Sequence, residues 1–307
     1  MGTREQSVDR RALAFDPSRQ WREYLTLCKP RVVSLIVFTA VIGMFLSTPG
    51  MVPVDILIFG TLGIGLAASA GAAINHIADR RIDAVMARTR GRPLPAGRLD
   101  NRAAALFAGL LCAVSMALLV FLVNPLTAVL TFASMIGYSV VYTLFLKWRT
   151  PQNIVIGGAA GAMPPVLGWT AVTGAVHPHA LLLFLIIFAW TPPHFWALAI
   201  HRRDDYARAE IPMLPVTHGV AFTRTYVLLY TVVLFLVSLL PFVTRMTGAL
   251  YLVAALILGA AFLYHAVVLY RGRDERAPLR TFAYSIQYLT GMFAALLIDH
   301  YFPLIVS

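Results

Sequence analysis

Nine stretches of mostly apolar residues, each close to the length that crosses a lipid bilayer, occupy most of this 307-residue chain. A helix needs about 20 predominantly apolar residues to span the hydrocarbon core. Only 13% of the residues are charged, about half the share typical of soluble domains. We therefore predict an all-α, polytopic membrane protein with nine transmembrane helices. The predicted spans are residues 31–48, 53–75, 103–123, 125–146, 151–173, 179–200, 223–244, 247–270 and 282–305.

The Lys and Arg residues are distributed asymmetrically about these spans. If the N-terminus lies inside, 24 of the 25 fall in the N-terminal segment or in loops on the same side, and only Arg245 lies on the other side. Loops rich in Lys and Arg stay on the cytoplasmic side of membranes. We therefore expect a multi-pass protein of the bacterial inner membrane, with its N-terminus in the cytoplasm and its C-terminus outside.

The first thirty residues differ from the rest because they are polar and include acidic side chains. They lack the apolar core of a secretory signal peptide, and their acids argue against a mitochondrial presequence. We expect residues 1–30 to form a cytoplasmic tail, with a short interfacial helix around 21–27, and residues 31–307 to form a single transmembrane domain. The loops that orient the spans explain the net charge of +11, so we predict no nucleic-acid partner.

The loop after the second predicted span begins with three polar residues at a spacing of four. On a helix that continues beyond the membrane surface, Asn75, Asp79 and Asp83 would face one side. Mg²⁺ usually binds one or two carboxylates together with substrate phosphates, and guanidinium groups match phosphate oxygens. Because Arg88 and Arg92 follow, the pattern favours a cytoplasm-facing site for Mg²⁺ and a diphosphate. The alternative is a solvated loop whose acids pair with nearby arginines.

A second polar loop, residues 201–219, follows the sixth predicted span. Its Asp204 and Asp205 are adjacent, so on a helix they point about 100° apart and only one can readily join a given site. We predict that Asp205 and Tyr206 contribute to the site, with Arg202 or Arg208 as a further phosphate contact. The alternative is a solvated turn between two spans.

Four further sequence segments point to a particular protein family. They are YTLFLKWRTP at 142–151, NIVIGGAAGAMPP at 153–165, WTPPHFWALA at 190–199 and IPMLPV at 211–216. Together with the two polar loops, they resemble the UbiA superfamily of intramembrane prenyltransferases, and within it the branch that farnesylates protohaem IX. The similarity runs from about residue 29 to the last span. Members with aromatic acceptors usually have spaced aspartates in the second loop, so the adjacent Asp204 and Asp205 fit the haem branch better.

This resemblance implies a helical bundle around a central cavity that opens laterally to lipid. It implies transfer of a farnesyl group from farnesyl diphosphate to a vinyl group of haem B, with addition of water, giving haem O and diphosphate. Haem O feeds haem-copper oxidases, so haem A synthase or a terminal oxidase assembly are potential partners. The closest alternative is a prenyltransferase acting on an aromatic or quinone precursor, and a transporter is the alternative from another class.

The resemblance also assigns residues by position. It implies that Asn75, Asp79 and Asp83 bind the Mg²⁺–diphosphate. It implies catalytic roles for these three residues and for Lys147 and Asp205. Arg88 and Arg92 would lie near the diphosphate, and Asn153, at the inner end of the fifth span, could reach it.

An allylic diphosphate that ionises leaves a carbocation, which electron-rich aromatic faces stabilise. Tyr138 and Tyr142, one helical turn apart in the fourth span, are the predicted aromatic residues, although interfacial packing explains them equally well. His194 is the predicted haem contact, because an ionisable side chain within the membrane indicates a functional site and imidazole ligates haem iron. It could instead act as a base for the added water or bond a carbonyl freed by the neighbouring prolines. Glycines in the fifth span would line a slot for the flat macrocycle, or serve packing alone.

Overall fold

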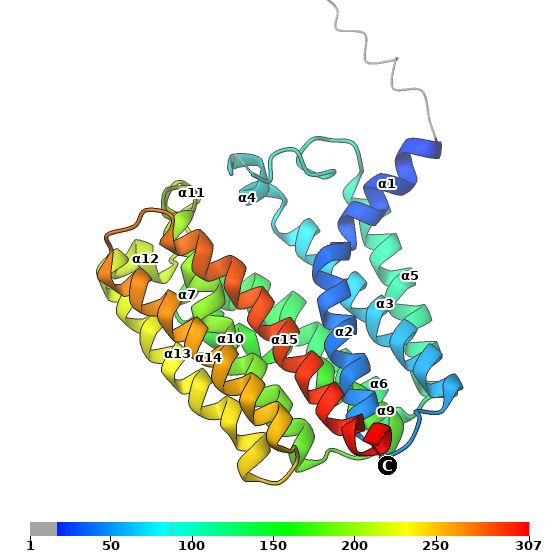
Figure 1. The fold of residues 1–307 in the computed structure, drawn as a ribbon. Coiled ribbons are helices and arrows are strands. Elements are labelled where there is room, and N and C mark those ends of the chain that lie inside the picture. The colour runs from blue at the N-terminus through cyan, green and yellow to red at the C-terminus, as the bar shows by residue number, and fades with distance from the viewer. Residues whose placement is uncertain (1–16, 87, 307) are drawn as a thin grey trace, which may run out of the picture.

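The computed structural model describes residues 17–86 and 88–306, and every regular element in that part of the chain is helical, as predicted. The long helices pack side by side in one bundle (Figure 1). The elements are α1 (Pro17–Leu27), α2 (Pro30–Leu46), α3 (Val54–Ala78), α4 (Arg80–Val85), α5 (Asn101–Leu122), α6 (Pro125–Ile136), the π-helix η1 (Gly137–Leu146), α7 (Lys147–Arg149), α8 (Asn153–Ala162), α9 (Pro164–Thr173), α10 (Pro178–His201), α11 (Arg203–Arg208), α12 (Leu214–Thr217), α13 (Gly219–Val243), α14 (Ala249–Arg271) and α15 (Ala277–Val306).

Eight segments of the described chain are long and apolar enough to cross a membrane, and the pair α1 and α2, bent by 50°, makes a ninth candidate. The prediction of nine membrane-spanning segments in a helical bundle is therefore confirmed. The helix expected around residues 21–27 is present as α1. Residues 1–16 of the predicted tail lie outside the described residues.

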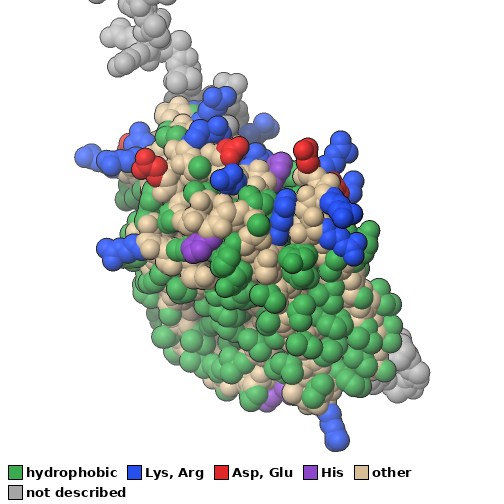
Figure 2. Space-filling view, turned by 90° about the vertical axis from the view of Figure 1, so that its left-hand side faces the viewer, with side chains coloured by type: hydrophobic (Ala, Val, Ile, Leu, Met, Phe, Trp, Pro, Cys, Tyr) green, Lys and Arg blue, Asp and Glu red, His purple; other side chains and the backbone are tan. Residues whose placement is uncertain are grey.

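Charged and apolar side chains occupy different parts of the surface. Figure 2 shows Lys, Arg, Asp and Glu gathered at one end, above a broad area of hydrophobic side chains. The short helices α4 and α11 lie at that end, whereas the connection between α13 and α14, which contains Arg245, lies at the opposite end (Figure 1). A polytopic membrane protein has this division, because apolar side chains face lipid and basic loops stay on one side.

Two of the spans are interrupted inside the bundle. The fifth span breaks between α8 and α9, where Pro164 begins the second helix, because proline lacks the N–H that would continue the ladder. In the fourth span, α6 passes into the ten-residue π-helix η1 before α7. The sequence analysis expected a regular helix there. A π-helix widens the turn and is frequent at functional sites.

Helix α2 packs directly against α9, and glycine makes this possible. A Cβ at Gly168 would lie 1.9 Å from the carbonyl oxygen of Ala40, and a Cβ at Gly43 would lie 2.3 Å from that of Pro165. Small residues let membrane helices approach to backbone contact. This contact holds the two helices together toward the end of the bundle that is remote from α4 and α11 (Figure 1).

Candidate active site

Asn75 lies in α3, Asp79 between α3 and α4, and Asp83 in α4, so a bend interrupts the continuous helix that was expected. Helix α3 ends at Ala78, and α4 begins at Arg80. The backbone N–H of Asp79 still donates to the carbonyl of Asn75, and that of Asp83 donates to Asp79. The spacing of four is therefore kept through the bend, and the three side chains are only 5%, 6% and 3% exposed.

Asp79 lies at the centre of a polar cluster that joins the second and fourth spans. Lys147 Nζ donates to its Oδ1 at 2.7 Å, and the Asn75 amide donates to its Oδ2 at 3.0 Å. The same amide also lies 3.3 Å from the hydroxyl of Thr143 in η1. Thr143 of the π-helix and Lys147, which directly follows it, therefore both contact residues at the end of α3.

Asp83 has its own cation. Arg92 donates from a terminal guanidinium nitrogen to Asp83 Oδ2 at 2.7 Å, and the Thr89 hydroxyl donates to the Asp83 carbonyl. The loop after α4 therefore folds back over the cluster. Arg88, in the same loop, is exposed.

The second polar loop forms α11, and only one of its two aspartates turns inward. Asp205 is buried, whereas Asp204 is exposed. Asp205 Oδ1 accepts a hydrogen bond from Arg208, and its Oδ2 lies 3.7 Å from Arg202. Both arginines are on or beside the same short helix, so Asp205 is held locally and makes no direct contact with Asp79.

Tyr206 connects the two loops electrostatically. Burial raises the pKa of its hydroxyl, Asp205 and Asp79 raise it further, and the Arg88 and Arg202 guanidinium groups oppose the rise. Charges from both polar loops therefore affect the Tyr206 hydroxyl.

Asn153, at the start of α8, is fully buried. Its amide nitrogen donates to the carbonyl of Thr150 at 2.8 Å, and its Oδ1 has no partner among the described residues. The contact to Thr150 closes the turn between α7 and α8. The carbonyl oxygen of the side chain is free to accept a further hydrogen bond.

The sequence analysis missed Lys29. This residue immediately precedes α2 in a left-handed conformation with φ of 50°, and its ammonium group donates to Asn75 Oδ1. Burial lowers the pKa of Lys29 to about 8, with contributions from Arg92 and Lys147 and opposing ones from Asp79 and Asp83. Its only signal in the sequence is a basic residue before the Pro30 that begins the first span.

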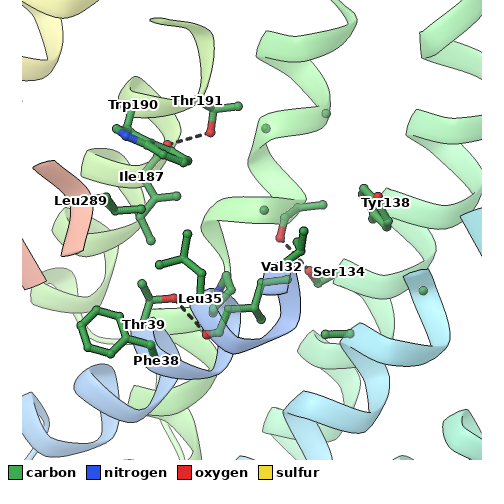
Figure 3. A pocket seen from close by; sticks show the side chains of 18 of the residues that line it. Val32, Leu35, Phe38, Thr39, Ser134, Tyr138, Ile187, Trp190, Thr191 and Leu289 are labelled. Atoms are coloured by element: carbon green, nitrogen blue, oxygen red, sulfur yellow. Dashed lines mark hydrogen bonds between the residues drawn. The ribbon is translucent and has the colours of Figure 1, made fainter. Parts of the chain in front are cut away.

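A large cavity opens into the bundle beside this cluster. It has a volume of about 680 Å³, within the range of pockets that bind small molecules. Its walls come from α2, α3, the fourth and fifth spans, α10 and α15. Figure 3 shows some of the lining side chains, which are mostly apolar: Val32, Leu35, Phe38, Thr39, Ser134, Tyr138, Ile187, Trp190, Thr191 and Leu289.

Three residues that line the cavity, each from a different helix, are also partly exposed. Val32 of α2, Phe195 of α10 and Ile286 of α15 line it and are each more than a third exposed. The lateral opening implied by the resemblance stays a prediction at these three helices. Arg31, which the sequence analysis also passed over, is the one Lys or Arg among the described lining residues.

Tyr138 and Tyr142 stand at the end of the cavity nearest the polar cluster. Both line it, and their rings stack with centroids 5.8 Å apart at an angle of 14°. Tyr142 is adjacent to Thr143, which contacts Asn75. A Cβ at Gly157 would lie 2.2 Å from the Tyr142 ring, so this glycine provides the space that the ring occupies.

His194 lies in the wall of the cavity, held between two aromatic rings. Trp190 stacks on one side with a centroid distance of 4.1 Å, and Phe282 of α15 lies 4.6 Å away. Pro192 and Pro193 precede it without ending α10. Its Nδ1 lies 2.6 Å from the hydroxyl of Ser285.

A model of the UbiA prenyltransferase family matches residues 36–297. The chain belongs to this family. It is therefore a prenyltransferase embedded in a membrane by several apolar helices, and the family expected from the sequence motifs is confirmed.

The relatives of this UbiA prenyltransferase point to one branch. It is 64% identical over 283 residues to the protoheme IX farnesyltransferase of Nitrosococcus oceani, covering 92% of this chain and 95% of that protein. It is 61% identical over 284 residues to the enzyme of the same name from Methylococcus capsulatus, with coverage of 92% and 95%.

Solved structures confirm the UbiA fold. A digeranylgeranylglyceryl phosphate synthase matches with a TM-score of 0.77 at 18% identity, over 92% of this chain and 98% of that one. A UbiA homologue from Archaeoglobus fulgidus bound to DMAPP and Mg²⁺ matches with a TM-score of 0.63 at 16% identity, over 89% and 99%. At these identities the likeness concerns the fold.

Proposed function

We propose that this protein transfers a farnesyl group from farnesyl diphosphate to a vinyl group of haem B, with addition of water, and so produces haem O. One arrangement carries the proposal. A polar cluster of Asp79, Asp83 and Lys147 adjoins the aromatic end of an apolar cavity, and His194 lies in the wall of that cavity. The name carried by the relatives at 61–64% identity supports the same reaction.

The side chains at the end of α3 fit a hard divalent cation. Asp79 and Asp83 offer carboxylate oxygens and Asn75 an amide oxygen, and Mg²⁺ typically takes one or two carboxylates together with substrate phosphates. Among the described residues, no three His, Cys, Asp or Glu side chains converge on one metal position, so diphosphate oxygens and water would complete the shell. When bound, Mg²⁺ would neutralise charge on the diphosphate and make it a better leaving group.

The basic side chains of the cluster are placed to receive the leaving diphosphate. In the structure, Lys147 pairs with Asp79 and Arg92 pairs with Asp83. Lys29 donates to the amide oxygen of Asn75. A metal on the carboxylates would free these cations to bond phosphate oxygens, which stabilises the charge that grows as the carbon–oxygen bond breaks. Arg88 of the loop after α4, and Arg202 and Tyr206 of the α11 loop, would add further contacts to the diphosphate.

The apolar cavity binds the hydrophobic parts of the two substrates, farnesyl diphosphate and haem B. The farnesyl chain lies along walls that contain few polar groups, so water is kept from the allylic cation before it meets the acceptor. The faces of Tyr138 and Tyr142 lie where that cation forms, and each aromatic face contributes roughly 0.5–2 kcal/mol of cation stabilisation. Asp205 pairs with Arg202 and Arg208 of its own loop.

Haem B enters from lipid between α2, α10 and α15. His194 Nε2 ligates its iron, which sets the macrocycle with one edge toward the tyrosines. The propionates need a cation at the membrane surface, and Arg31 lies on the cavity rim without an acidic partner among the described residues. Arg31 therefore fixes which edge of the macrocycle points outward.

The charged end, with its site, faces the cytoplasm of a bacterial cell, and residues 31–307 act as one transmembrane domain after the N-terminal tail of residues 1–30. The distribution of Lys and Arg supports this orientation. Cysteines introduced at Asp204 and Thr244, at opposite ends, test it with a membrane-impermeant maleimide on intact cells. We expect labelling at position 244 alone. Labelling at position 204 alone would show the opposite orientation.

An acceptor comparison separates this function from prenylation of an aromatic or quinone precursor. Purified protein in lipid nanodiscs receives farnesyl diphosphate, Mg²⁺ and either haem B or 4-hydroxybenzoate, and products are identified by mass. We expect haem O from the first mixture and unchanged acceptor from the second. The reverse pattern would assign the protein to the aromatic-acceptor branch.

A further inference from the structure

The hydroxyl of Ser285 contacts two groups at short distance. Its Oγ lies 2.6 Å from the carbonyl oxygen of Phe282, one turn earlier in α15, and 2.6 Å from Nδ1 of His194 in α10. Ser285 is fully buried, and His194 is only 8% exposed. The second ring nitrogen, Nε2, has no hydrogen-bond partner among the described residues, and the ring borders the cavity.

The number of protons decides the direction of these two hydrogen bonds. A serine hydroxyl has one proton to donate, and a carbonyl can only accept. If the Ser285 proton pointed at Nδ1, two oxygen acceptors would face each other at 2.6 Å with no proton between them. The arrangement in which both contacts are hydrogen bonds has Ser285 donating to Phe282 and His194 donating from Nδ1. In that tautomer Nε2 carries no proton and keeps its lone pair.

We propose that Ser285 is a positioning residue that holds His194 in the Nδ1–H tautomer, so that the Nε2 lone pair points into the cavity as the ligand for haem iron. This inference rests on the proposed function, because it takes haem B as the acceptor. A metal-binding histidine commonly donates its other N–H to an oxygen acceptor, which fixes both its tautomer and its orientation. Ser285 supplies that acceptor from a different span.

The surroundings keep Ser285 in place. Trp190 donates its indole N–H to the backbone carbonyl of Ser285 at 2.7 Å while its ring stacks on His194. The carbonyl oxygen of Phe282 accepts the hydrogen bond from Ser285, and the Phe282 ring also stacks on the imidazole. One turn of α15 and one turn of α10 therefore fix the imidazole in its plane, its rotation and its tautomer.

The test uses haem binding, measured without farnesyl diphosphate so that turnover plays no part. Wild-type protein and the variants Ser285→Ala, Ser285→Thr and His194→Ala are titrated with haem B in nanodiscs. The Fe–His stretching band of the ferrous complex is recorded by resonance Raman. Ser238→Ala serves as the control, since Ser238 is also a buried serine that bonds a carbonyl and a side chain of another helix.

We expect a Fe–His band in the wild type and none in His194→Ala. In Ser285→Ala the band should shift to lower frequency and haem affinity should fall about tenfold, the lower end for loss of an outer-shell partner of a metal ligand. Ser285→Thr should restore both, and Ser238→Ala should leave both unchanged. If Ser285→Ala does not yield monodisperse protein, Ser285→Cys replaces it.

An unchanged band and affinity in Ser285→Ala would overturn the positioning role, and a Fe–His band that persists in His194→Ala would overturn the assignment of the ligand. Failure of the proposed function is a separate result. In that case the wild type would make no haem O in the product assay, whatever the haem spectra show.

Discussion

Lys147 Nζ lies 2.7 Å from Asp79 Oδ1, although the two residues are 68 positions apart in the chain. Both side chains are buried, so each charge needs the other, because an unpaired charge in this environment is costly. The ion pair connects the second and fourth spans and holds the site ready before substrate arrives. Under the proposed function, Asp79 would bind the Mg²⁺–diphosphate complex, and Lys147 would then be available to the phosphate oxygens.

The carboxylates of Asp79 and Asp83 should be required for turnover. Asp79→Asn and Asp83→Asn keep side-chain size and hydrogen bonding but remove the charge that would hold the metal. We expect haem O formation to fall by about 10²–10³-fold, the scale of losing one preorganised electrostatic contact. Asp204→Asn is the matched control, because Asp204 is exposed beside buried Asp205. Activity above a tenth of wild type in both variants would contradict metal binding by Asp79 and Asp83.

Lys29 should contribute to binding of the diphosphate. Lys29→Ala removes the ammonium group that contacts Asn75, and we expect KM for farnesyl diphosphate to rise about tenfold, equivalent to about 1.4 kcal/mol. Arg22→Ala in α1 is the control, because Arg22 is exposed and forms no ion pair among the described residues. Steady-state kinetics on both variants tests the assignment. Equal KM values would leave Lys29 with a purely structural role.

Some of this architecture could be read from the sequence because local signals determine it. Runs of apolar residues specify spans without any tertiary information, and a spacing of four keeps Asn75, Asp79 and Asp83 on one side even though the helix bends at Asp79. Pro164 coincides with the break in the fifth span, because proline lacks a backbone donor, although Pro192 and Pro193 leave α10 continuous.

Other features depend on contacts between distant segments. Lys29 and Ser285 have ordinary sequence surroundings, and their partners lie 46 and 91 residues away. The π-helix η1 has no composition that distinguishes it from an α-helix of the same residues. Arg88 and Arg92 looked equivalent in the sequence, yet only Arg92 contacts Asp83. The sequence indicated the residues of a candidate site, and packing determines which of them are in contact.

Gly161 offers a way to fill the cavity without disturbing the fold. A Cβ at this position meets no atom within 4 Å, and the residue lines the cavity. Gly161→Leu should therefore insert and fold normally but lower turnover at least tenfold, because the new side chain takes space needed by the substrates. Gly109→Leu is the control, since Gly109 also has open space around it but lies on the outer face of α5. Full activity of Gly161→Leu would mean that the substrates lie elsewhere.

Arg31 should recognise the haem propionates. Arg31→Ala should weaken binding of haem B by about fivefold, since an ion pair between partly exposed groups contributes on the order of 1 kcal/mol. The dimethyl ester of haem B lacks the carboxylates, so its affinity should be the same for wild type and variant. Binding titrations with both macrocycles give this comparison. An equal loss of affinity for haem B and its ester would attribute the effect to packing.

The most direct test of the whole account is the amount of haem O made from farnesyl diphosphate and haem B by the purified protein in nanodiscs, with Mg²⁺ and after chelation by EDTA. We predict haem O and stoichiometric diphosphate with Mg²⁺, almost none after chelation, and recovery when Mg²⁺ is restored. Haem O formation that is unaffected by chelation would contradict a metal-held diphosphate at Asp79 and Asp83. Absence of haem O under every condition would contradict the proposed reaction itself.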